Sequence, residues 1–225
     1  MNQSFGPPRF ALHIRNWSLP GAKRFLSVVQ DPSILEEVAK FITETLFDNQ
    51  HPPPEVRSIT IAITSHEALS TMQAAAFHSA SDLDSVHHMI EIGEPYLATI
   101  DAGRLHDEVL GLCLHEMVHC FHARGNKECP QGLIEGLADW VRLRRGLAPP
   151  HWEASISSRW DAGYDTTAYF LEHLERAYGT GTVARINSMA CSSSYRKSDW
   201  EDLFGKDVEA LWQEYCTVVK AKEKI

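Results

Sequence analysis

Residues 104–124 read RLHDEVLGLCLHEMVHCFHAR, and this stretch decides the fold prediction. Apolar side chains lie on almost every face of the helix that these residues would form, which is typical of a helix buried in a protein core. Asp107 and Glu108 lie in the first turns, where negative charge stabilises the helix dipole, and Gly125 is placed to end the helix. We therefore predict a long buried helix over Arg104–Arg124.

Within this helix, His115 and His119 are four residues apart, so their imidazoles lie on one face about one turn from each other. This spacing suits two ligands of a tetrahedral zinc ion, and Glu116 lies beside them, where it can reach a water held by the metal. The alternative is a surface helix with two histidines and one glutamate. We favour the metal, because burying these polar groups costs free energy unless they have a partner.

A catalytic zinc ion needs a third protein ligand and one open position. The pattern H-E-x-x-H-x-x-G-x-x-H would supply that ligand, but here His122 and Gly125 occupy its glycine and histidine places in the reverse order. His122 cannot readily turn back to the same metal along a continuous helix. We interpret it as a packing residue, or at most as a residue next to the ligands.

Residues 133–145 form a second predicted helix, which places Glu135 and Asp139 on one face. Glu135 is the favoured third ligand, and Asp139 can accept the other ring N–H of a ligating histidine and fix its tautomer. Gly136 would let this helix approach the motif helix closely. The alternative is an exposed acidic face, for which the apolar neighbours leave little room. Glu128 is a weaker ligand candidate in a charged loop.

The segment RWDAGYD at residues 159–165 precedes another predicted helix. Hydrolysis of a peptide bond builds negative charge on the carbonyl oxygen, which a nearby O–H donor stabilises. Tyr164 can supply that donor. Alternatively, Trp160 and Tyr164 pack against other residues and Asp165 caps the helix.

Strands are predicted before the motif helix, and helices are predicted after it, so the class is α+β. Residues 1–30 are expected to be irregular apart from a short strand at Arg9–Ile14, and residues 74–86 are expected to form a loop. We predict a single domain over residues 1–225, with the sheet and motif helix in residues 1–125 and a helical C-terminal part in residues 126–225. The other predicted strands are 57–64, 88–92 and 96–100, and the other predicted helices are 31–46, 165–178, 182–189 and 207–222.

Composition excludes several classes of protein. The net charge of −9 argues against nucleic acid or an anionic membrane as the main partner. No apolar run has the length of a membrane span, and residues 1–17 lack the apolar core of a signal peptide, so we expect a cytoplasmic protein. Five scattered cysteines do not resemble a disulfide framework. We interpret Cys113 and Cys120 as buried packing groups rather than metal ligands.

Several blocks of sequence occur in an order that resembles a known family: HEMVH, GLIEGLADWVRLRRG, RWDAGYDTTAYFLEHL and LFGKDVEALWQEY. They resemble the plant basic secretory protein family of peptidases, which is similar to the gluzincin metallopeptidases. The resemblance covers roughly residues 88–215. This chain departs from the family in being acidic and in lacking a secretory signal, and the family is largely secreted.

The resemblance implies one zinc ion held by His115, His119 and Glu135, with Glu116 as the general base. It also implies a zincin-like fold, in which a small mixed sheet packs on the motif helix. In such enzymes the substrate pairs with an edge strand, for which His88, Ile90 and Ile92 are the candidates. We expect hydrolysis of peptides or proteins. One alternative is a non-enzymatic binding protein, for example one with a role in defence, that retains a structural zinc; another is a hydrolase of another amide or ester. The sequence does not indicate an oligomeric state.

Overall fold

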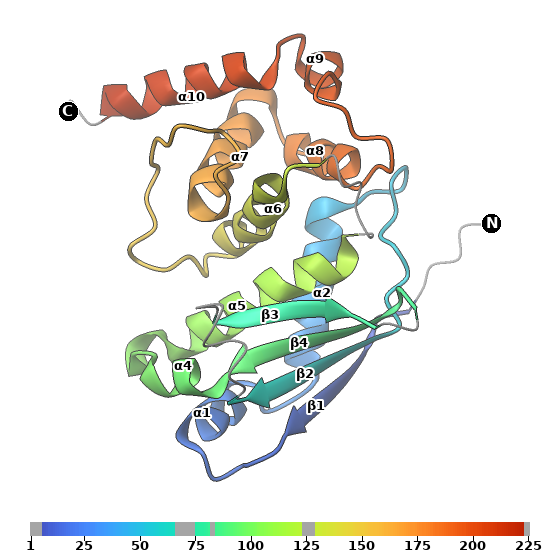
Figure 1. The fold of residues 1–225 in the computed structure, drawn as a ribbon, viewed down its shortest axis with the longest axis vertical. Coiled ribbons are helices and arrows are strands. Elements are labelled where there is room, and N and C mark those ends of the chain that lie inside the picture. The colour runs from blue at the N-terminus through green and yellow to red at the C-terminus, as the bar shows by residue number, and fades with distance from the viewer. Residues whose placement is uncertain (1–5, 66–74, 82–83, 123–128, 223–225) are drawn as a thin grey trace. The chain divides into compact units, whose positions relative to one another are not determined.

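A computed structural model describes residues 6–65, 75–81, 84–122 and 129–222 (Figure 1). The chain divides into two compact units. The first consists of residues 1–44 and 53–123, and the second consists of residues 45–52 and 124–225. The prediction that residues 1–225 form a single domain stays a prediction.

A mixed sheet of four described strands forms the centre of the first unit, in the order β1-β2-β4-β3. The strands are β1 (Arg9–Ile14), β2 (Ser58–Thr64), β3 (Ala76–Ala80) and β4 (His87–Gly93). β1 pairs with β2 and β2 pairs with β4 in parallel, whereas β3 pairs with β4 in antiparallel orientation. Small as it is, this sheet fits the mixed sheet that the sequence predicts.

The pleat of the sheet decides which side chains enter the core. In β4, His88, Ile90 and Ile92 are buried while Met89 is exposed, as expected when successive side chains point to opposite faces. His78 of β3 lies directly opposite Ile90 in the ladder, so its side chain is on the same face as His88. One face of the sheet thus carries two histidines among isoleucines.

Three segments of the first unit differ from the prediction. Residues 20–28 form helix α1 (Pro20–Val28), in which Pro20 occupies the first turn, where its missing N–H is tolerated. Residues 94–99 form helix α4 (Glu94–Thr99) rather than a strand, with Pro95 in its first turn. The predicted loop at residues 74–86 contains β3. Pro20 and Pro95 thus each lie in the first turn of a helix that the sequence did not predict.

The motif helix is α5 (Leu105–Phe121), which follows a 3₁₀ turn at Ala102–Arg104 and packs against β3 and β4. It ends three residues before the predicted Arg124, because the backbone of His122 is extended. Gly125 lies outside the described residues. Helix α2 (Ser33–Leu46) agrees closely with the predicted helix at residues 31–46.

The described part of the second unit is helical. Its elements are α6 (Gln131–Arg144), α7 (Tyr164–Tyr178), α8 (Thr182–Ala190), α9 (Asp199–Phe204) and α10 (Val208–Lys222). All except the short α9 were predicted. Aromatic side chains form much of its core, where Trp200 stacks on Phe170 and meets Trp160 edge to face. The described parts of the two units together confirm a mixed α+β class.

Gly136 lies where α6 packs against α7, and its predicted approach to the motif helix stays a prediction. A Cβ added there would lie 2.3 Å from Cγ2 of Thr167. The bare face of Gly136 is therefore turned toward α7, and it allows α6 and α7 to pack closely.

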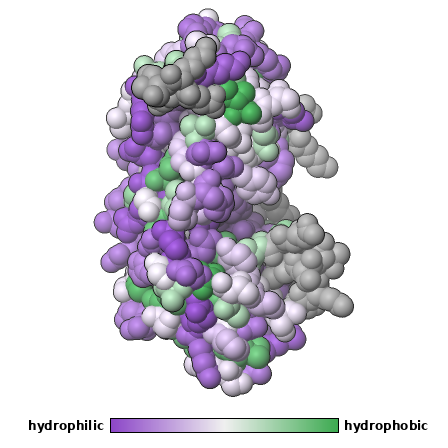
Figure 2. All heavy atoms as spheres, turned by 90° about the vertical axis from the view of Figure 1, so that its left-hand side faces the viewer, coloured by the Kyte–Doolittle hydropathy of each residue, from purple (hydrophilic) through white to green (hydrophobic). Residues whose placement is uncertain are grey.

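None of the described helices has the length and apolar composition needed to cross a bilayer. On the face drawn in Figure 2, hydrophobic residues are scattered among hydrophilic ones. This distribution is ordinary for a protein surface in contact with water.

The packing of Gly136 gives a first prediction. We expect Gly136→Ala to lower the free energy of unfolding by about 1–3 kcal/mol, because the added methyl overlaps Thr167 and the helices must separate. Gly6→Ala adds the same methyl where nothing lies within 4 Å, and it serves as the control. Denaturant unfolding of both variants checks this prediction. Equal stability of the two variants would contradict the packing.

Candidate metal centre

His115 and His119 point to a common position beside α5. Their Nε2 atoms are 3.3 Å apart, and their rings meet edge to face with centroids 5.0 Å apart. Both residues are partly buried. The helical spacing thus brings together the two nitrogens that the sequence predicts to bind a metal.

The separation of the two nitrogens can be compared with that in a metal complex. In a tetrahedral site with zinc–nitrogen bonds of about 2.0–2.1 Å, two ligand nitrogens lie about 3.3–3.4 Å apart. The observed 3.3 Å fits this value without movement of either ring. In the metal-free protein, one ring can donate a hydrogen bond to the other over the same distance.

Glu116, between the two histidines in sequence, is buried, with only 7% of its surface exposed. It lies near two cysteines of the same helix. Burial, followed by the charge of Glu116, raises the pKa of Cys113 to about 12 and raises the pKa of Cys120 well above its ordinary value. The carboxylate of Glu116 therefore lies among apolar side chains of α5. Such surroundings would shield a general base from bulk solvent.

Glu135 and Asp139 lie on α6 in the second unit. The Oε1 atom of Glu135 accepts a hydrogen bond of 2.8 Å from Nε2 of Gln131, one turn earlier, and the side chain is partly exposed. Asp139 is buried, with 2% of its surface exposed. The predictions that Glu135 joins the imidazole pair and that Asp139 orients a histidine concern residues of different units, and they stay predictions.

Tyr164 begins α7 at an unusual backbone conformation. Its φ of 49° lies in the left-handed region, which an aromatic residue rarely adopts and which costs free energy. The preceding Gly163 donates a backbone hydrogen bond of 2.9 Å to Oγ1 of Thr167. A Cβ added at Gly163 would lie 3.7 Å from Cβ of Glu135. The turn thus places Tyr164 next to a glycine near Glu135, and Tyr164 itself is 59% exposed.

The prediction that the strand with His88, Ile90 and Ile92 lies at an edge of the sheet is wrong. The strand with His88, Ile90 and Ile92 is β4, which lies between β2 and β3 and pairs with both. Its backbone groups are therefore used within the sheet, and these three side chains are buried. Among the described strands, β3 is the outermost on this side. The sequence could not show this because β3 was interpreted as a loop.

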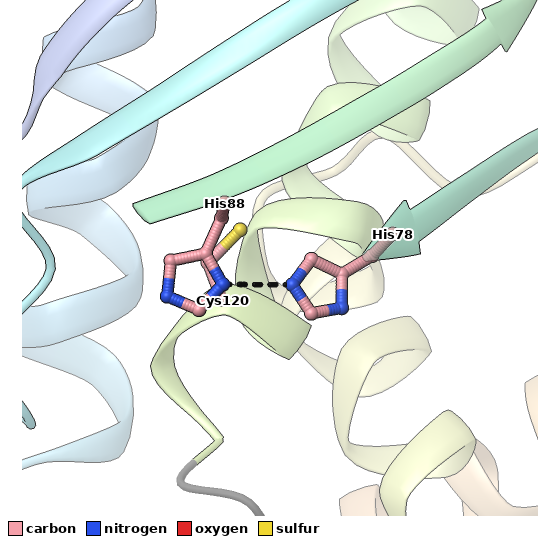
Figure 3. A group of neighbouring side chains, drawn as sticks. All are labelled: His78, His88 and Cys120. Carbon is pink, nitrogen blue, oxygen red and sulfur yellow. Dashed lines mark hydrogen bonds between the residues drawn. The ribbon is translucent and has the colours of Figure 1, made fainter. Parts of the chain in front are cut away.

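The structure adds a group of residues that the sequence did not identify. His78 of β3, His88 of β4 and Cys120 of α5 each have a potential ligand atom, and these atoms lie within 4.8 Å of one another (Figure 3). Nε2 of His78 is 2.9 Å from Nδ1 of His88. Burial, followed by the charges of His119 and His88, lowers the pKa of His78 to about 3, so the ring is neutral at physiological pH.

His122 and Glu128 are the two weaker candidates for a metal ligand. His122 follows the last turn of α5, with its ring centroid 6.0 Å from that of His119. Its interpretation as a packing residue stays a prediction. Glu128 lies outside the described residues.

A helix with paired imidazoles beside a small mixed sheet defines an α+β protein with a candidate metal site. The family model described as "Peptidase of plants and bacteria", BSP, matches residues 7–215 of the chain. The chain therefore belongs to this peptidase family, which is the basic secretory protein family that its sequence resembles. No curated protein and no solved structure matches the chain.

The imidazole pair gives a prediction for metal binding. We expect His115→Ala and His119→Ala each to weaken zinc binding strongly, because each removes a ligand. Loss of a residue that only supports a ligand already weakens binding by about 10–100-fold, so the effect here should be larger. His106→Ala removes an exposed imidazole from the same helix and should leave the affinity unchanged. Competition with a chromophoric chelator measures all three. Wild-type affinity in both His115→Ala and His119→Ala would contradict the site.

Proposed function

We propose that the chain is a zinc-dependent peptidase in which a metal-activated water attacks the peptide bond. The observation that carries the proposal is the 3.3 Å separation of the His115 and His119 nitrogens beside the buried Glu116, in a chain of a peptidase family. Each part of this arrangement matches a requirement of metal-dependent hydrolysis. The substrates are peptides or proteins.

His115, His119 and Glu135 would hold one zinc ion. Two imidazoles and one carboxylate form the ligand set of a known kind of catalytic zinc site, which leaves a position for water. The packing of α5 against β3 and β4 supports a zincin-like arrangement of the first unit. Asp139, which is buried one turn after Glu135, would accept the second ring N–H of a ligating histidine and fix its tautomer.

A zinc ion held by these residues would supply a water whose pKa is lowered to about 7 and would polarise the peptide carbonyl. Glu116 would act as the general base that takes a proton from this water during the attack. The same carboxyl group then gives the proton to the nitrogen of the leaving amine, so that one side chain acts first as a base and then as an acid. Its shielding from bulk solvent keeps the proton available for this second step.

Tyr164 would donate its phenolic O–H to the carbonyl oxygen while negative charge builds on it. Two features of the second unit support this role. The backbone of Tyr164 is held at a costly φ by a turn that packs on α6 beside Glu135, and the side chain is exposed rather than packed in the core. Strain of this kind is found more often at functional sites than elsewhere.

Replacing the proposed base gives the central prediction for function. We expect Glu116→Gln to lower kcat for peptide hydrolysis by about 10²–10⁴-fold, because the amide cannot take the proton, while the metal content stays that of the wild-type protein. Glu36→Gln makes the same chemical change at an exposed position on α2 and should keep full activity. Hydrolysis of a mixed peptide library, with metal analysis of each variant, measures both quantities.

Three outcomes would contradict this proposal. Undiminished hydrolysis by Glu116→Gln would remove the proposed base. Bound zinc in the wild-type protein without turnover of any peptide would favour a non-enzymatic binding protein that retains the metal, and ester or other amide substrates in the same panel would reveal a different hydrolase.

Tyr164 can be tested separately. We expect Tyr164→Phe to lower kcat by about 10²–10³-fold with little change in KM, because the O–H donor acts on charge that develops only in the transition state. Tyr178→Phe, at the other end of α7, removes a comparable hydroxyl and serves as the control. Equal kcat values for the two variants would show that Tyr164 has no part in the reaction.

A further inference from the structure

Three side chains of the first unit converge outside the imidazole pair of α5. They are His78 from β3, His88 from β4 and Cys120 from the last turn of α5 (Figure 3). In Figure 3 a ring nitrogen of His78 faces one of His88, and the Cys120 side chain lies beside the His88 ring. The three residues come from three separate elements, so their convergence is a product of the fold rather than of local sequence.

The donor types define what the group can bind. Two imidazoles and a thiolate together favour borderline or soft cations, above all zinc and copper(I), over magnesium or calcium, which prefer oxygen ligands. His88 is 7% exposed and Cys120 is 2% exposed, so a cation here would be shielded from water. This set differs from that of His115, His119 and Glu135 because it includes sulfur and no carboxylate.

The geometry requires little adjustment. His78 Nε2 and His88 Nδ1 are 2.9 Å apart, and a tetrahedral zinc ion would need about 3.3–3.4 Å between two ligand nitrogens. The three potential ligand atoms lie within 4.8 Å of one another, so metal binding would need the two rings to move slightly apart and the Cys120 sulfur to turn toward them. The cation would replace the hydrogen bond between the rings, and the proton of the Cys120 thiol would leave to solvent as the metal–sulfur bond forms.

We propose that His78, His88 and Cys120 form a second metal site, which takes a thiolate-binding cation of the zinc class. The site ties β3 and β4 to the end of α5 and so braces the helix that carries the paired imidazoles. It does not depend on the proposed peptidase activity. The chain would then bind two metal ions, one with and one without a sulfur ligand.

Cobalt(II) distinguishes the two sites, because a thiolate ligand gives a near-ultraviolet charge-transfer band that nitrogen and oxygen ligands do not give. Reduced, metal-free full-length protein is titrated with cobalt(II). We expect this band in the wild-type protein and also in the double variant His115→Ala/His119→Ala. We expect Cys120→Ser to abolish it, and Cys113→Ser, a buried thiol of the same helix, to retain it.

The half-buried His78 provides a second test if Cys120→Ser does not fold, as judged by circular dichroism. We expect His78→Gln to weaken the cobalt affinity read from the band by at least tenfold, because a ligand is lost. The proposal is overturned if the wild-type protein shows no charge-transfer band at saturating cobalt. It is also overturned if the band persists in Cys120→Ser, or if His78→Gln binds cobalt with wild-type affinity.

Discussion

The desolvation of polar side chains on α5 is the constraint on which the structure depends. This helix has fully buried Val109, Leu114, Met117 and Val118, yet the same turns hold two imidazoles and the buried carboxylate of Glu116. Removing such groups from water is unfavourable unless they acquire partners. A divalent cation is a partner for both imidazoles at once, and their 3.3 Å separation is already that of two ligands of one zinc ion.

The last turn of α5 contributes a side chain to each of the two groups of potential metal ligands. His119 and Cys120 are consecutive, so they lie about 100° apart around the helix. His119 turns to His115, whereas Cys120 turns to the histidines on the sheet. The rings of His78 and His119 have centroids only 6.1 Å apart, so the two groups of potential ligands are close neighbours. A brace at the sheet would therefore limit the movement of His119, and well-held ligands are a general requirement of metal sites.

The sequence predicted those parts of the structure that depend on local periodicity. The strand SITIAIT and the helix at residues 164–178 follow directly from alternation and from the spacing of apolar residues. The imidazole pair follows from helix geometry alone. In contrast, α1 and α4 were missed because proline also begins helices, and β3 was missed because AFHSA lacks β-branched residues. The group of His78, His88 and Cys120 could not be predicted, because its members meet only through the pairing of β3 with β4 and the packing of α5.

The central claim is that His115 and His119 hold a zinc ion together with Glu135. Crystals of the zinc-loaded protein, measured on both sides of the zinc absorption edge, locate the metal directly by anomalous scattering. We expect a peak about 2.0–2.2 Å from both Nε2 atoms and from a carboxylate oxygen of Glu135, with one further position open to solvent. A peak absent from the imidazole pair, or a Glu135 carboxylate directed away from it, would contradict the claim.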